Sequence, residues 1–136
     1  MSGFEQNLAA LVGCSLHIEN SGIYPSDEVG EGSAAILFSN GTRLRADYWR
    51  LLHKQPRLSS FDHRQKYGLP APIDAIAELR KALENSKVVA ATLDNESADL
   101  IFVFDNDCKL QILTVTDHEI WEIHFPNGTG QYSNYL

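Results

Sequence analysis

The fold of this chain is indicated most clearly by one run of sequence, AAILFSNGTRLRADY, at residues 34–48. Its apolar first half ends at Asn40-Gly41, the dipeptide best suited to the positive φ angles of a type I′ turn. Alternate residues of the second half point to opposite faces, so one face carries Leu44, Ala46 and Tyr48. The other face carries Arg43, Arg45, Asp47 and Trp49. The run therefore predicts a β-hairpin with one core face and one mostly charged face.

An amphipathic helix is predicted downstream of two prolines, Pro70 and Pro72. Pro72 stands where a missing backbone N–H costs nothing, and Asp74 faces the positive end of the helix dipole. Apolar residues then recur at steps of three and four, at Ile73, Ile76, Leu79 and Leu83. We expect one long helix that ends near Ser86.

Four strands are predicted after the helix, at Val88–Leu93, Leu100–Phe104, Leu110–Val115 and Glu119–Phe125. Their connections are short and polar, which favours an antiparallel meander. A second Asn-Gly pair, Asn127-Gly128, predicts a turn into a short last strand through Tyr132–Tyr135.

The other segments give weaker patterns. Near the N-terminus we expect a short helical lead-in, a strand and a loop, at Leu8–Val12, Leu16–Glu19 and Ser21–Gly32. Residues Arg50–Leu69 have no clear period and are predicted to be irregular, with a short strand near Leu58–Phe61. Together these elements predict an α+β fold: a mostly antiparallel twisted sheet of about six strands packed against one long helix.

Length and composition predict a single globular domain over residues 1–136, because 43% of the residues are hydrophobic and 21% are charged. No apolar run is long enough to span a membrane, and no basic region precedes a hydrophobic stretch at the N-terminus. We therefore expect a cytoplasmic protein that does not bind membranes, in which Cys14 and Cys108 are free thiols.

The net charge of −7 argues against nucleic-acid binding but hides a basic segment. Between Arg43 and Lys66, seven basic residues stand against two acids, so this segment carries +5 and the remainder carries −12. Aromatic side chains lie among the cations, and both kinds of side chain are favoured at binding hot spots. The candidate binding residues are Arg43, Arg45, Trp49, Arg50, Asp62, His63, Arg64 and Tyr67. The alternative is that these cations only neutralise the acidic surface of the chain itself and that Tyr48 and another ring belong to the core.

No motif supports catalysis or a cofactor. The five histidines are scattered, and none has the spacing that places two metal ligands on one helical face, so we expect no metal site and no cofactor. Asp105-Asn106-Asp107 begins like a calcium loop, but Lys109 and Leu110 stand where a ligand and a glycine are needed, so a hairpin turn is predicted. Neither cysteine has an obvious partner that would lower its pKa.

Two stretches of this chain, Leu37–Leu51 and Glu119–Ile123, resemble a group of small uncharacterised bacterial proteins. Some of those proteins look like immunity-type proteins found near toxin genes. The resemblance implies a protein partner, and it implies no role for any single residue.

Two functions follow as hypotheses. The first is a non-catalytic protein-binding module, immunity-like as the resemblance implies, that contacts its partner through the basic segment or the acidic remainder. The second is a small-molecule binding protein or enzyme, with a pocket under the irregular segment in which His63 and its basic neighbours meet an anionic ligand. A homodimer formed through an exposed strand edge is compatible with either hypothesis.

Overall fold

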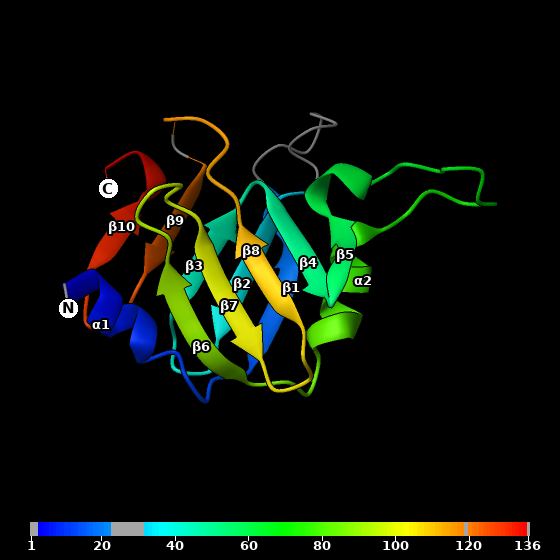
Figure 1. The fold of residues 1–136 in the computed structure, drawn as a ribbon. Coiled ribbons are helices and arrows are strands. Elements are labelled where there is room, and N and C mark those ends of the chain that lie inside the picture. The colour runs from blue at the N-terminus through cyan, green and yellow to red at the C-terminus, as the bar shows by residue number, and fades with distance from the viewer. Residues whose placement is uncertain (1–2, 23–31, 119, 136) are drawn as a thin grey trace.

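A computed structural model describes residues 3–22, 32–118 and 120–135 of the chain and shows two antiparallel sheets (Figure 1). The first sheet, in spatial order, contains β1 (Leu16–Asn20), β2 (Ala34–Phe38), β3 (Arg43–Ala46), β9 (Trp121–His124) and β10 (Gly130–Tyr132). The second contains β5 (Gln55–Ser59), β4 (Trp49–His53), β8 (Lys109–Ile112), β7 (Leu100–Phe104) and β6 (Val88–Leu93). The first is called sheet A and the second sheet B.

The predicted fold class is wrong in its arrangement. The structure is a sheet-rich α+β fold with two sheets of five strands each, rather than one sheet of about six strands on one long helix. The predicted helix is also shorter: α2 covers Ala75–Leu83, and Asp74 is its N-cap. Ile73 belongs to the preceding loop, where its backbone is hydrogen-bonded to Arg64 and Gln65. The other described α-helix is α1 (Gly3–Ala9).

The hairpin at residues 34–48 is confirmed, since β2 and β3 pair around the Asn40-Gly41 turn. The irregular structure predicted for Arg50–Leu69 is wrong in its first half, which forms most of β4 and all of β5. The turn between these strands has Lys54 at φ 69°, a conformation that glycine or asparagine usually supplies. Because no turn dipeptide marks the position, the sequence pattern does not show this hairpin.

The chain passes between the two sheets at two places. It leaves sheet A after β3 and enters sheet B at Trp49, and it returns through residues 113–120 between β8 and β9. The predicted four-strand meander is therefore correct for β6, β7 and β8 and wrong for the fourth strand, which joins sheet A beside β3. The last strand, β10, ends at Tyr132, and a 3-10 turn at Ser133–Tyr135 replaces the rest of the predicted strand. The predicted loop at Ser21–Gly32 lies mostly outside the described residues, as does Glu119.

The core lies between the sheets and is filled by the alternate, inward-facing residues of both. Phe38 of sheet A meets Phe102 of sheet B with ring centroids 5.5 Å apart. Each helix closes one side of this sandwich: α1 packs on β6, and α2 packs on β1 and β5. Figure 1 shows the helices on opposite sides of the sheets. The outer faces of both sheets are consequently left for solvent or for ligands.

Candidate functional site

The predicted binding residues do not form one surface. Arg43 and Arg45 lie on the outer face of sheet A, whereas Arg50 lies on β4 and donates two hydrogen bonds to Gln111 of sheet B. Trp49 is fully buried, and its indole N–H donates to the Gly32 carbonyl at 2.7 Å. The crossing between sheets after β3 explains the separation, because residues on either side of it belong to different sheets.

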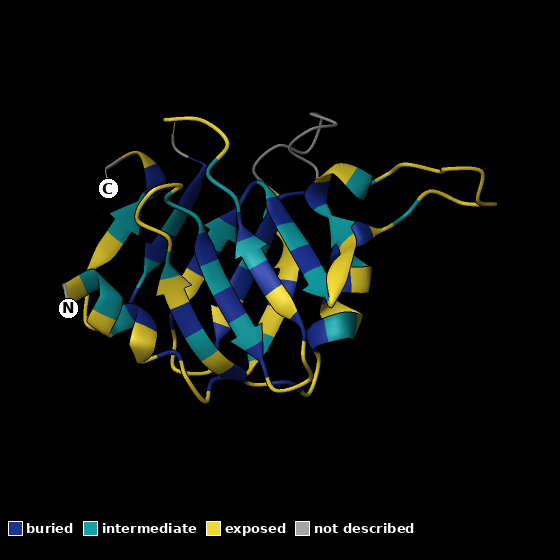
Figure 2. Cartoon of the chain, viewed as in Figure 1, coloured by how far each residue is buried: buried dark blue, intermediate teal, exposed yellow. Residues whose placement is uncertain are grey.

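The other four candidates come together at one projecting loop: His63, Arg64 and Tyr67 lie on the loop, and Asp62 lies in the 3-10 turn from which it starts. This loop, residues 63–73, is called the arm. It leaves the 3-10 turn η2 (Ser60–Asp62), extends away from the sheets and returns to the start of α2 (Figure 1). Most of its length is exposed (Figure 2).

Hydrogen bonds fix the base and the two sides of the arm. At the base, the Ala75 amide donates a hydrogen bond to His63 Nδ1 at 3.1 Å. Between the two sides, the Arg64 amide donates to the Ile73 carbonyl and the Ile73 amide donates to the Gln65 carbonyl, at 2.8 and 2.9 Å. These bonds give the arm a defined conformation even though it packs little against the sheets.

A single carboxylate joins the tip of the arm to η2. Asp62 accepts a hydrogen bond from the Ser59 amide at 2.8 Å and another from the Tyr67 hydroxyl at 3.0 Å. The second bond raises the pKa of Tyr67 above its usual value, because the negative carboxylate favours the protonated phenol. Tyr67 is thereby held in place although the residue is 67% exposed.

Three large hydrophobic side chains are exposed in and beside the arm, at Phe61, Tyr67 and Leu69. The backbone at Tyr67 has φ 45°, an angle that non-glycine residues seldom adopt. Arg64, at φ 68°, is in the same region. Exposed apolar side chains that gather in one region are typical of segments used for binding.

A cleft of about 1020 Å³ lies at the base of the arm. Leu69, Pro72 and Ile73 of the arm form one wall, and Leu51 and Leu58 of sheet B form another. The polar groups that also line it are His53, Arg57, Asp74, Glu78, Asn106 and Cys108. The predicted pocket under this part of the chain therefore exists, but His63 is not among the residues that line it.

Cys108 and His53 are the two side chains of this cleft that most resemble a catalytic pair. The Cys108 Sγ atom lies 3.5 Å from His53 Nδ1. Burial raises the pKa of the Cys108 thiol, and the neighbouring Asp107 carboxylate raises it further. A thiol with a raised pKa is protonated at neutral pH and is a poor nucleophile. Among the described residues there is also no cluster of three side chains that could hold a metal ion.

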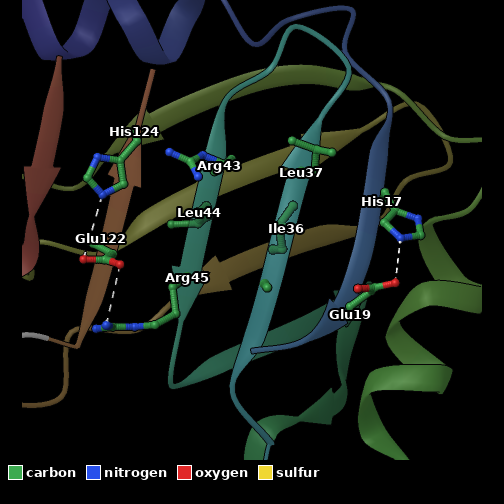
Figure 3. Close-up of a pocket in the computed structure, with 10 residues that line it drawn as sticks. His17, Glu19, Ile36, Leu37, Arg43, Leu44, Arg45, Glu122 and His124 are labelled. Atoms are coloured by element: carbon green, nitrogen blue, oxygen red, sulfur yellow. Dashed lines mark hydrogen bonds and ion pairs between the residues drawn. The ribbon is translucent and has the colours of Figure 1, made fainter. Parts of the chain in front are cut away.

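A second hollow, of about 380 Å³, lies on the outer face of sheet A (Figure 3). We call it the sheet A groove. Strand register places its side chains in two rows. One row contains His17, Leu37, Arg43 and His124, and the other contains Glu19, Ala35, Arg45 and Glu122. The alternation of Glu122 and His124 with buried neighbours is visible in the sequence, but their position beside Arg43 and Arg45 depends on the pairing of β3 with β9.

No protein-family model, curated protein or solved structure matches the chain. Its resemblance to immunity-type proteins therefore stays a prediction. None of the helices described here is long and apolar enough to cross a membrane.

Proposed function

We propose that the protein is a non-catalytic protein-binding module and that the arm is its main contact element. The observation that carries this proposal is the arm itself, an exposed loop with Tyr67 and Leu69 at its surface and hydrogen bonds that fix its conformation. Apolar side chains that are exposed together, as Phe61, Tyr67 and Leu69 are in and beside the arm, are typical of interaction surfaces.

The fixed conformation of the arm favours binding because little conformational entropy is lost when a partner covers it. Tyrosine adds a large contact area with few rotatable bonds, and such residues frequently dominate binding energy. Arg64 and Lys66 place positive charge next to these apolar side chains. The complementary partner therefore has an acidic surface with an apolar depression, and the charges would speed association.

The cleft beside the arm extends the same contact surface. Its apolar walls can receive a side chain of the partner, since Leu69 lines both the cleft and the exposed part of the arm. The resemblance to immunity-type proteins, whose partners are proteins, points in the same direction.

The test begins with isolation of the partner from the native host, with the wild-type protein as bait. The affinity of that purified partner is then measured for a Tyr67→Ala/Leu69→Ala variant. We expect binding to weaken at least thirtyfold, about 2 kcal/mol, because both side chains lie in the contact. The matched control is Val89→Ala/Val115→Ala, which shortens two half-exposed apolar side chains elsewhere and should bind like the wild type.

Equal binding by both variants would refute the arm as the contact element. If no specific protein is captured by the wild type, the cleft becomes the better candidate, as a site for a small molecule with an apolar body. Its volume and apolar walls are those of small-molecule sites, and Arg57 would supply a cation.

A further inference from the structure

Each sheet has two edge strands, and β6 differs from the other three. An edge strand leaves backbone N–H and C=O groups unpaired, and proteins protect such edges by proline, by charge, by short length or by a covering segment. The outer edge of β1 is covered by α2, whose Arg80 Nε donates a hydrogen bond to the Ile18 carbonyl at 2.8 Å. Strand β10 has only three residues, and β5 begins with Gln55-Pro56-Arg57. These three edges are therefore protected against further pairing.

The sequence of β6 has none of these protections. It reads Val88-Val89-Ala90-Ala91-Thr92-Leu93, with no charged residue and no proline. The segment after α1 is hydrogen-bonded to the first residue of the strand, since the Gly13 amide donates to the Val88 carbonyl at 2.7 Å and the Val88 amide donates to the Cys14 carbonyl at 2.9 Å. These bonds occupy the Val88 end of the edge and leave the Leu93 end open.

The hydrogen bonds between β6 and β7 show which backbone groups face the open edge. The Asp94 amide donates to the Asp99 carbonyl at 2.9 Å, so the backbone groups of Asp94 point towards β7. In an antiparallel strand, these groups alternate in direction from one residue to the next. Those of Leu93 and Ala91 therefore point away from β7, and none of the described residues is hydrogen-bonded to them there.

A hollow of about 370 Å³ between β6 and α1 gives access to this edge. We call it the β6 groove. On the strand side it is lined by the consecutive residues Val89–Leu93, whereas one face of a sheet would contribute only every second residue. On the helix side it is lined by Glu5, Leu8, Ala9 and Val12. Val12 and Val89 are 52% and 49% exposed, so the groove has apolar walls.

We propose that a second copy of this chain occupies the β6 groove and that the two β6 strands pair antiparallel about a two-fold axis. Such pairing is self-complementary, because each copy offers the N–H and C=O groups that the other copy lacks. The chain carries a net charge of −7, but like charges do not meet within the paired strands, because β6 has no charged residue. Sheet B continues through both copies in this dimer.

The occupied end of the edge determines the register. Because Gly13 and Cys14 lie beside Val88, the second strand cannot extend to that residue. The register that pairs both free residues and avoids Val88 places Thr92 opposite Thr92 of the second copy. Ala91 then lies opposite Leu93 of the second copy, and their backbone groups are hydrogen-bonded. Leu93 packs against the core side of its sheet, so in the second copy it covers the α1 wall of the groove.

This dimer goes beyond the proposed function, because it uses a different part of the molecule. Figure 1 shows β6 and the arm on opposite sides of the sandwich. Both arms are therefore free in the dimer and can contact protein partners at the same time.

The test begins with sedimentation equilibrium of the wild-type protein from about 1 μM to about 1 mM. We expect a mass of twice 15.2 kDa at the upper end of this range. Hydrogen exchange of the Ala91 and Leu93 amides should slow about tenfold between the two ends, whereas that of the Lys66 amide in the arm should not change. A mass of 15.2 kDa at every concentration would overturn the proposal.

Charge variants test the pairing itself. Thr92 is exposed, and Thr92→Lys places like charges directly opposite each other at the two-fold axis, so the dimer should weaken about tenfold. Thr116→Lys makes the same change at an exposed threonine outside the groove and should dimerise like the wild type. An equal mixture of Thr92→Lys and Thr92→Glu should recover the dimer, because opposite charges then meet. This recovery distinguishes a lost contact from a misfolded variant.

Two further results would contradict the proposal: a dimer that Thr92→Lys leaves unchanged, or a mixture that fails to recover it. The Tyr67→Ala/Leu69→Ala variant separates this proposal from the proposed role of the arm. It should lose affinity for the protein partner and still dimerise. Loss of the dimer in this variant would place the second copy on the arm and refute pairing through β6.

Discussion

Asp47 shows how a single buried carboxylate is retained in this fold. It is 4% exposed, accepts a hydrogen bond from the Ser33 hydroxyl at 2.8 Å and forms an ion pair with Arg45. Desolvation is the larger influence, and it raises the pKa of Asp47 above the ordinary value of 3.8 despite these partners. The contacts with Ser33 and Arg45 therefore offset only part of the free-energy cost of burying the charged Asp47 carboxylate.

This raised pKa predicts a specific pH dependence of stability. A carboxyl group with a higher pKa in the folded state contributes stability that is fully present below pH 3.8 and is lost as the pH rises through the folded-state pKa. Asp47→Asn removes the titrating group and keeps the shape of the side chain. We expect the free energy of unfolding of this variant to fall less than that of the wild type as the pH rises from 3 to 7. Urea denaturation at each pH measures both.

The control for this measurement is Glu96→Gln, which neutralises an exposed carboxylate in the turn between β6 and β7. Its pH profile should follow that of the wild type. A profile of Asp47→Asn parallel to the wild type would contradict the assignment of a raised pKa to Asp47.

At the scale of a single element, the start of α2 depends on Asp74. Its carboxylate accepts a hydrogen bond from the Ala77 amide at 3.0 Å, and it lies 4.0 Å from His63 at the base of the arm. Asp74→Ala removes this cap and should lower the free energy of unfolding by about 1 kcal/mol. Denaturant unfolding measures the loss.

Asp74→Asn is the matched variant, because asparagine caps helices about as well as aspartate. It should retain most of the stability, and Glu84→Ala, at the other end of the helix, should cost nothing. A loss with Asp74→Asn equal to that with Asp74→Ala would show that charge, rather than the capping hydrogen bond, determines stability here.

Across the whole molecule, we expect backbone amides near the centre of the sandwich to exchange with solvent more slowly than amides far from it. Strands β7 and β8 are paired on both sides and carry fully buried residues, so their amides should exchange most slowly. Within the arm, the amides of Arg64 and Ile73 are hydrogen-bonded across the loop. Hydrogen exchange should find both slower than the amide of Lys66, and equal rates would contradict a fixed conformation of the arm.

Local features of the sequence predicted the local elements. Asn40-Gly41 and the alternation around it predicted the first hairpin, and Asp74 with the apolar stripe of α2 predicted a helix at nearly the right place. The strands β6, β7 and β8 were predicted for the same reason, since alternation, turn chemistry and helix caps depend on neighbours within a few residues. The grouping of Asp62, His63, Arg64 and Tyr67 also follows from their closeness along the chain.

Only the tertiary structure decided which strands share a sheet. A strand such as β9 has the same sequence pattern whether it pairs with β8 or with β3, because alternation specifies a buried face and not a partner. The crossing after β3 separated Trp49 and Arg50 from Arg43, and the pairing of β3 with β9 placed His124 beside Arg43. The sequence by itself therefore determined the β2–β3 hairpin, α2 and the strands β6, β7 and β8, whereas long-range packing between the two sheets decided the core, the cleft and the sheet A groove.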